Sequence, residues 1–267
     1  MWRLVLIACV LLCAGCLGSS RLRYESAQEA YEKGMEFSED GKYERAAQYL
    51  QAVFDFGRTH EWADDAQLQL ARTHRAAGEY ILSASEYARF TELYRADPRI
   101  PDVEFERAMT YFERSPEFEL DQSNTERGIE VFYVYMQRYP DHDSVEVARQ
   151  RVLELREKLA LKQFANAGLY ERRGLFEAAA LSYEVVFDEY PDTDRAVDAL
   201  VGAIRCYIEF SDQSVEQRQP ERLQKAIDHY ERLIQLFPDS EYLDEAERLY
   251  VRAREGLDRL IAGTREG

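Results

Sequence analysis

The sequence predicts an all-α protein made of repeated helix–turn–helix units, and two observations support that prediction. Helix breakers are scarce, with 13 Gly and 7 Pro in 267 residues, whereas 46% of residues are hydrophobic and 32% are charged. This composition is typical of helices that bury one face and expose the other to water. The second observation is self-similarity, because the same small, aromatic, Gly and Pro positions recur along the chain. We therefore expect a solenoid of about five repeats with a C-terminal capping helix.

The chain opens with a segment that has the features of an export signal. Arg3 precedes an apolar run, Leu4 to Leu12, that is too short to span a bilayer. The ending Cys13-Ala14-Gly15-Cys16 resembles the bacterial lipobox, which predicts removal of residues 1–15 and a covalent lipid on Cys16. By the sorting pattern of such lipoproteins, Leu17 implies the outer membrane. An ordinary secretory signal cut near Ser19 is the alternative.

Cysteine use fits this interpretation. Residues 16–23 would form a lipidated tether, which leaves Cys206 as the one unmodified cysteine after processing. No intrachain disulfide could then form, so stability must come from packing. Cys206 lies on an apolar stripe, and we expect a small buried residue there rather than a nucleophile.

The repeats follow the tether in order. The first helix of a unit is expected to end at Gly41, Gly78 or Gly174, since Gly tolerates the positive φ that reverses the chain. Pro140, Pro191 and Pro238 stop the second helix, and we expect the Asp, Ser or Thr that follows to cap the next one. The five units span 24–59, 60–98, 101–141, 145–192 and 194–239, and residues 240–267 form a capping helix and tail.

Small and aromatic residues keep a fixed register inside these helices. Small residues permit close approach of two helices, and aromatic residues fill the space beside them. This register resembles that of the tetratricopeptide (TPR) repeat. The small positions are Gly34, Ala71 and Ala167 in the first helices and Gly128, Ala179 and Ala226 in the second helices.

Two units contain polar inserts, 115–124 and 211–219, between their helices. We expect both inserts to be loops, the usual location of binding specificity. They could equally be solvated spacers.

No motif in the sequence indicates catalysis, metal binding or nucleic-acid binding. The four His residues lack metal-ligand spacing, and no HExxH, CxxC, GxSxG or phosphate-loop pattern occurs. His74 falls on an aromatic packing position, so we expect a core histidine. A net charge of −17 (34 Lys+Arg, 51 Asp+Glu) excludes a basic face for nucleic acid. The sequence therefore predicts neither an enzyme nor a metal or cofactor site.

A solenoid of helix pairs presents a groove lined by the first helix of each unit, where a peptide could bind. Helical periodicity places one residue stripe per unit on that side. Apolar and Met side chains beside two arginines would suit an extended peptide with an aromatic end and a carboxylate. If the superhelical twist turns the stripe inward, the same side chains pack between repeats instead. The predicted groove residues are Tyr31, Met35, Leu68, Arg72, Arg75, Phe105, Met109 and Phe112.

A lipobox cysteine, a short tether and five TPR-like units together resemble the BamD family, the lipoproteins of the bacterial outer-membrane β-barrel assembly machine. The resemblance is strongest from Asp97-Pro98-Arg99-Ile100-Pro101 to Tyr139-Pro140-Asp141, where the third helix pair lies. It continues through Tyr170-Glu171-Arg172-Arg173-Gly174 to Tyr190-Pro191-Asp192-Thr193. It covers about 24–210, and the fifth unit with its insert departs from the family pattern.

The resemblance implies a non-catalytic scaffold on the periplasmic face of the outer membrane, held there by the lipid on Cys16 and needing no cofactor. It further implies that the C-terminal units bind the barrel-forming BamA subunit, beside other assembly-machine lipoproteins. The N-terminal units would receive C-terminal peptides of unfolded outer-membrane proteins, which end in an aromatic residue. Two rival functions share the repeat fold: a periplasmic TPR adaptor in envelope constriction, and a lipoprotein of polysaccharide export.

Overall fold

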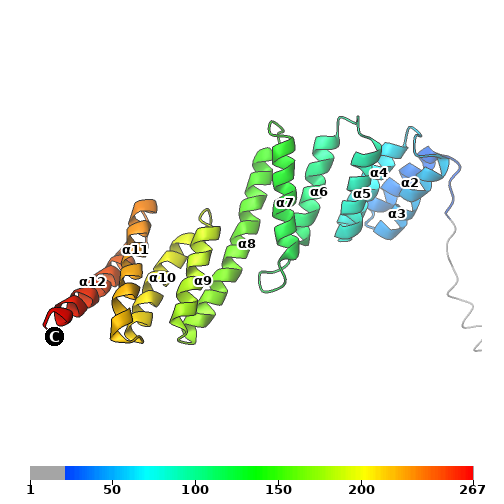
Figure 1. Ribbon diagram of the computed structural model, residues 1–267. Coiled ribbons are helices and arrows are strands. Elements are labelled where there is room, and N and C mark those ends of the chain that lie inside the picture. The colour runs from blue at the N-terminus through cyan, green and yellow to red at the C-terminus, as the bar shows by residue number, and fades with distance from the viewer. Residues whose placement is uncertain (1–21, 267) are drawn as a thin grey trace, which may run out of the picture. The chain divides into compact units, whose positions relative to one another are not determined.

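The computed structural model describes residues 22–266, and the regular structure in that range is eleven α-helices and two short 3₁₀-helices (Figure 1). No strand occurs in the described residues, so the all-α prediction is confirmed. The chain divides into two compact units, one up to Arg107 and one from Ala108 onward. We call them the N-terminal unit and the C-terminal unit and describe each by itself. The predicted signal and Cys16 lie outside the described residues.

The N-terminal unit holds two helix pairs and the first half of a further helix. Helices α2 and α3 pack against each other, as do α4 and α5, and α4 contacts both α2 and α3. Tyr87 and Phe90 of α5 are fully buried against Leu68 of α4 and Val103 of α6. The elements are α2 (Ala27–Glu39), α3 (Tyr43–Ala52), η2 (Val53–Phe56), α4 (Ala63–Ala76), α5 (Tyr80–Leu93) and α6 (Ile100–Arg114), which crosses into the next unit.

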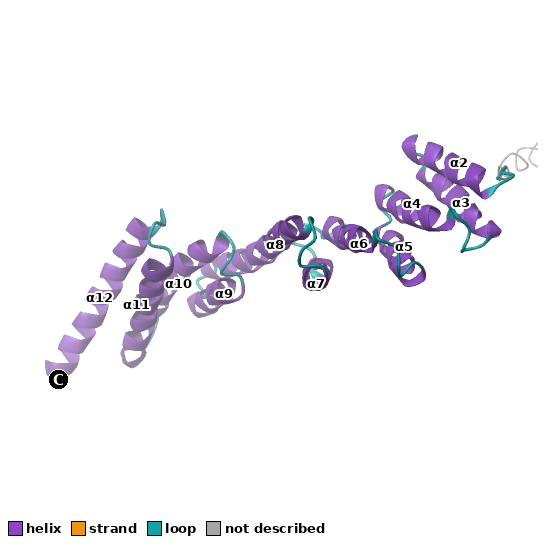
Figure 2. Cartoon of the chain, turned by 90° about the horizontal axis from the view of Figure 1, so that it is seen from above, coloured by secondary structure: helices purple, strands orange, loops and turns teal. Residues whose placement is uncertain are grey.

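The C-terminal unit is built around a layer of three helices, α8, α10 and α12, in which α10 contacts both of the others. Helix α9 packs between α8 and α10, and α11 packs between α10 and α12, while α7 packs on α8. One continuous apolar core runs from α8 to α12. Figure 2 shows these helices joined by short loops. Their bounds are α7 (Ser123–Arg138), α8 (Val145–Arg172), α9 (Phe176–Glu189), α10 (Arg195–Asp212), η3 (Glu216–Arg218), α11 (Gln219–Leu236) and α12 (Leu243–Glu266).

Three glycine turns reverse the chain inside helix pairs, as the sequence predicts. Gly41, Gly78 and Gly174 have φ values of 72°, 74° and 71°. The residue after each glycine donates its N–H to the carbonyl five residues earlier, for example Leu175 N to Tyr170 O at 3.0 Å. The glycine N–H donates to the carbonyl three residues earlier, which completes a Schellman motif. These bonds satisfy carbonyls that the end of a helix would otherwise leave unpaired.

The small residues mark points of close helix approach, which confirms that prediction. A Cβ on Gly34 of α2 would lie 2.7 Å from Leu50 Cγ of α3. A Cβ on Gly128 of α7 would lie 3.0 Å from Leu155 Cδ1 of α8. The four alanines at the other small positions are fully buried: Ala71, Ala167, Ala179 and Ala226.

The predicted caps after Pro are wrong for two helices. Helices α8 and α10 start after Ser144 and Asp194, and neither side chain makes a capping hydrogen bond. Asp192, which follows Pro191, instead accepts two hydrogen bonds from Arg156 Nε of α8, at 3.0 and 2.8 Å. The Asp192 carboxylate is therefore engaged by the guanidinium of Arg156.

Neither insert is a loop throughout: α7 begins at Ser123, so the loop prediction for 115–124 is wrong at its last two residues. Residues 115–122 lack helix, and Lys158 Nζ of α8 donates to Ser115 Oγ at 2.7 Å, which ties this loop to α8. In the second insert, α10 continues through Asp212 and a 3₁₀-turn, η3, follows before α11 begins at Gln219. The loop prediction for 211–219 is therefore wrong in part. The buried face of α10 continues to Ser211, which favours helix into the insert.

Buried polar and thiol groups occupy packing positions, as predicted. Cys206 of α10 is fully buried, and this burial raises the pKa of its thiol to about 12. His74 is buried at the end of α4, with its Nδ1 atom 2.6 Å from Glu79 Oε2. A thiol that stays protonated near neutral pH is a poor nucleophile, so Cys206 is a packing residue.

Candidate functional site

The predicted groove residues of the N-terminal unit lie on the first helices α2, α4 and α6. Tyr31 of α2 is partly buried against Trp62, with ring centroids 5.2 Å apart, and burial raises the pKa of its hydroxyl. Met35 of α2 and Phe105 of α6 are also partly buried and keep some surface in contact with solvent. Arg72 of α4 is exposed, and Arg75 of α4 is partly buried. This group, Tyr31, Met35, Arg72, Arg75 and Phe105, is called the peptide face below.

Leu68 does not belong to the peptide face. It is 3% exposed and packs with Tyr87, Phe90 and Val103 in the core of the N-terminal unit. The groove prediction for Leu68 is therefore wrong. Its position one turn before Ala71 on α4 turns it toward α5, where an aromatic pair closes over it.

Arg72 already holds a carboxylate. Its Nε donates to Glu106 Oε2 at 2.8 Å and its Nη2 donates to Glu106 Oε1, so the pair is bidentate. Tyr87 OH also donates to Glu106 Oε2, at 2.8 Å. Burial works to raise the pKa of Glu106, but the bonds from Arg72 and Tyr87, with the charge of Arg75, outweigh it and hold that pKa below its usual value. The site is thus built for a carboxylate, and this chain supplies one.

The C-terminal unit contains a matching arrangement. Arg205 Nη1 of α10 donates to Glu171 Oε1 of α8 at 2.7 Å, and Tyr183 OH of α9 donates to Glu171 Oε2 at 2.7 Å. Arg205 also donates to Glu245 Oε1 of α12 at 3.2 Å. In both units a tyrosine of a second helix and an arginine of a neighbouring first helix meet one glutamate. Sequence reasoning missed these triads because the Arg and Glu lie 34 residues apart, about one repeat.

Met109 and Phe112 belong to the C-terminal unit and are partly buried. The guanidinium of Arg151 lies over the Phe112 ring, 5.0 Å from its centroid. Such cation–π contacts fix the ring and cover one of its faces. Phe112 thus packs against Arg151 of α8.

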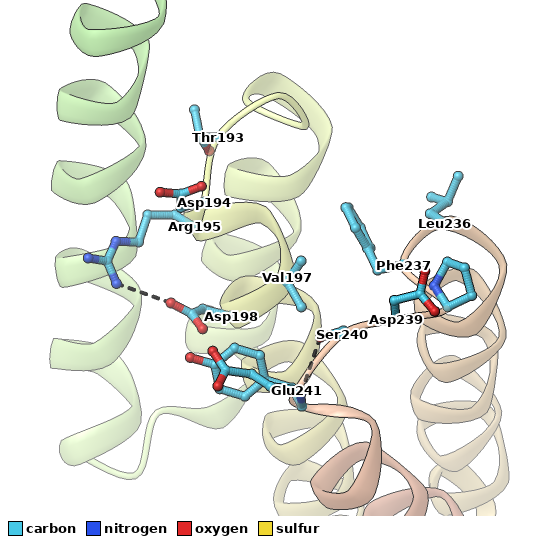
Figure 3. A pocket seen from close by; sticks show the side chains of 12 residues that line it. Thr193, Asp194, Arg195, Val197, Asp198, Leu236, Phe237, Asp239, Ser240 and Glu241 are labelled. Atoms are coloured by element: carbon cyan, nitrogen blue, oxygen red, sulfur yellow. Dashed lines mark hydrogen bonds and ion pairs between the residues drawn. The ribbon is translucent and has the colours of Figure 1, made fainter.

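A pocket of about 700 Å³ lies in the C-terminal unit where α10 begins and where α11 passes into α12 (Figure 3). Its apolar wall consists of Val197, Leu236, Phe237 and Pro238, and its other residues include four carboxylates and Arg195. We call it the acidic pocket. Sequence reasoning missed it, although two acidic segments, Asp192-Thr193-Asp194 and Asp239-Ser240-Glu241, each follow a repeat-ending Pro.

No arrangement in the described part of the chain indicates metal chemistry, since residues 22–266 contain no group of three His, Cys, Asp or Glu side chains that could hold a metal ion. Within the same range, no helix is both long and apolar enough to cross a bilayer.

The helix pairs are closed by glycine turns, packed at small residues and cross-linked by Arg–Glu–Tyr triads. These features define a TPR-like helical repeat protein. Residues 23–223 match a family model, YfiO, described as an outer membrane lipoprotein. The match covers more than half of the chain, and the protein belongs to this family of outer membrane lipoproteins.

Curated relatives carry a more specific name. The chain is 26% identical to the outer membrane protein assembly factor BamD of Caulobacter vibrioides over 212 residues, which is 76% of this chain and 70% of that protein. It is 25% identical to the assembly factor BamD of Vibrio cholerae over 225 residues, 80% of this chain and 86% of that protein. The resemblance to BamD predicted from the sequence is confirmed.

Solved structures of TPR proteins are also similar. The TPR domain of P58(IPK) matches over 90% of this chain and 67% of that chain, at 17% identity and a TM-score of 0.41. A tetratricopeptide repeat protein from Parabacteroides merdae matches over 84% of this chain and 98% of that chain, at 14% identity and a TM-score of 0.37.

Proposed function

We propose that the protein is a non-catalytic scaffold of the outer-membrane protein assembly (Bam) complex, which helps β-barrel proteins to insert and fold. The observation that carries this proposal is the family match, which spans the helices from the start of α2 into α11. The relatives named as assembly factors support it, because they align over most of the chain. A depletion strain tests it: loss of the protein should lower the amounts of β-barrel proteins in the outer membrane. Unchanged barrel levels with a defect in division or polysaccharide export would favour the rival functions.

We propose further that lipid on Cys16 holds the protein at the periplasmic face of the outer membrane. Several acyl chains on one cysteine anchor a protein stably where a single chain does not. Cys16→Ala should therefore move the protein from the outer-membrane fraction to the soluble periplasmic fraction. Cys206→Ala is the matched control and should leave the location unchanged. Wild-type and Cys16→Ala proteins in the same fraction would contradict the anchor.

The proposed partners of the C-terminal unit are a BamA-like barrel subunit and other lipoproteins of the assembly machine. The proposed partners of the peptide face are C-terminal peptides of unfolded outer-membrane proteins. The partly exposed apolar side chains of Tyr31, Met35 and Phe105 would contact the terminal aromatic residue. Arg72 and Arg75 would attract its carboxylate. Because Arg72 is engaged by Glu106, the peptide carboxylate must share or displace that glutamate.

Phe105→Ala should weaken binding of a peptide that ends in an aromatic residue by at least tenfold, since a truncated aromatic anchor loses much of its buried area. Isothermal titration calorimetry with the full chain measures this, and Ile81→Ala, at an exposed residue of α5, is the control. An unchanged affinity with a lowered melting temperature would show that Phe105 is a packing residue and that the peptide face is misplaced.

Glu106→Gln removes the internal carboxylate while keeping the shape of the side chain. If the peptide carboxylate competes with Glu106 for Arg72, this variant should bind a peptide with a free C-terminus several-fold more tightly. Its affinity for the same peptide with a C-terminal amide should change little. Equal changes for the two peptides would contradict the competition.

A further inference from the structure

The acidic pocket has a charge that the chain itself does not neutralise. Asp194, Asp198, Asp239 and Glu241 bring four carboxylates to its lining, and Arg195 is its one cationic side chain. Arg195 Nη1 lies 3.1 Å from Asp198 Oδ2, and Arg195 Nε lies 3.3 Å from Glu157 Oε1 outside the pocket. Within residues 22–266 no cation pairs with the carboxylates of Asp194, Asp239 or Glu241. The pocket therefore keeps a negative potential that favours a positive ligand group.

The pocket lining also has apolar side chains that are accessible to solvent. Leu236, at the end of α11, is 52% exposed, and Pro238 also lines the pocket, as does Phe237, which lies beside Asp239 (Figure 3). The Phe237 ring is supported from behind by Phe187 of α9, with ring centroids 6.5 Å apart at 81°. The ring thus has a fixed position, which limits the side-chain entropy lost when a ligand packs on it.

We propose that the acidic pocket binds a segment of a partner protein in which an arginine or lysine stands next to aliphatic or aromatic side chains. The cation would pair with carboxylates of the lining, and the flanking apolar side chain would pack on Leu236 and Phe237. A volume of about 700 Å³ accommodates a few side chains. Arginine fits best, because its planar guanidinium pairs with two carboxylates while its stem covers apolar surface. A metal ion would leave the apolar wall without a contact.

The acidic pocket lies in a different unit from the peptide face, and its ligand can be tested without reference to the proposed function. The test uses internal peptides with blocked ends, so that no terminal carboxylate takes part. The probe is fluorescein-Gly-Ser-Leu-Arg-Phe-Ser-Gly-amide, and its binding to the full chain in detergent is measured by fluorescence anisotropy. The matched probe carries citrulline in place of arginine. Citrulline has the same shape as arginine but no charge.

The arginine peptide should bind at least fivefold more tightly than the citrulline peptide, and added salt should reduce the difference. The double variant Asp239→Asn with Glu241→Gln should abolish the preference, whereas Glu231→Gln, at an exposed residue of α11 outside the pocket, should retain it. Leu236→Ala should weaken both peptides. Equal binding of the two peptides, no binding of the arginine peptide, or a preference that survives the double variant would each overturn the proposal.

Discussion

Tyr183 of α9 has a glycine of a neighbouring helix on each of two sides, and the two glycines should respond in opposite ways to substitution. A Cβ on Gly202 of α10 would lie 2.9 Å from two atoms of the Tyr183 ring, which is held in the core. A Cβ on Gly168 of α8 would meet only Arg172 Nη1 at 3.3 Å and Tyr183 OH at 3.6 Å. The first contact is rigid, and the second involves the flexible end of an arginine.

Gly202→Ala should therefore lower the free energy of unfolding by about 1–3 kcal/mol, the usual cost of overpacking. Gly168→Ala should raise it by about 0.5–1 kcal/mol, because alanine restricts the unfolded chain and favours helix. Urea denaturation of both variants measures the two effects. A Gly202→Ala protein as stable as the wild type would show that Tyr183 can move aside.

Asp97 should make the stability of the N-terminal unit depend on pH. Arg99 donates to it from both its side chain and its backbone N–H, at 2.7 and 2.8 Å. The side-chain bond is the main reason that the pKa of Asp97 lies below its usual value. The contribution of the Asp97 charge to the free energy of unfolding is complete above the unfolded-state pKa of about 3.9. It is lost as the pH falls through the lower folded-state pKa.

Asp97→Asn should therefore destabilise the protein at pH 7, and the gap to the wild type should narrow toward pH 3. Urea denaturation at both pH values measures the gap, and Glu39→Gln, at an exposed carboxylate of α2, serves as the control. A gap that stays constant between pH 7 and pH 3 would contradict a role for the Asp97 charge.

Local residue patterns were predictable, and long-range pairs were not. Gly41, Gly78 and Gly174 follow from a local rule, since only a residue that tolerates positive φ closes these turns. Glu106 has no local signature, and its pairing with Arg72 depends on how α4 and α6 come together. The groove prediction for Leu68 was wrong for a related reason. Helical periodicity places residues on one stripe but does not say how far the core extends around the helix.

At the scale of elements, the turn between α8 and α9 is the most direct test of the repeat geometry. Gly174 sits at φ 71°, and nothing lies within 4 Å of a Cβ added there, so strain alone opposes a side chain. Gly174→Ala should destabilise the C-terminal unit by about 1–2 kcal/mol. Hydrogen exchange should show faster exchange at the Leu175 N–H, which closes the turn. Unchanged exchange would mean that another turn type forms without cost.

Element boundaries were predictable where a breaker marks them and not where polar composition alone was the guide. Pro140, Pro191 and Pro238 each follow the end of a second helix closely. The insert 211–219 contains no Gly or Pro, and the buried face of α10 continues to Ser211, next to the end of the helix at Asp212. Polar residues are compatible with an exposed helix face, so polarity did not identify a loop there.

For the whole molecule, the sequence predicts class and family better than it predicts sites. Repeat periodicity and the resemblance to BamD are properties of the entire chain, and the family match over residues 23–223 agrees with both. The acidic pocket is lined by residues from 193–198 and from 236–242, two segments that lie about one repeat apart in the sequence. Only a folded repeat brings those two loops together, so the pocket could not be read from the sequence.

The central claim, membership of the outer-membrane protein assembly complex, is tested most directly by affinity purification of the Cys16-lipidated protein from detergent-solubilised outer membranes. Mass spectrometry of the co-purifying proteins identifies the partners, and the Cys16→Ala protein gives the background. We expect recovery of a large β-barrel protein that carries periplasmic repeat domains. Recovery of division or polysaccharide-export components without such a barrel would contradict it.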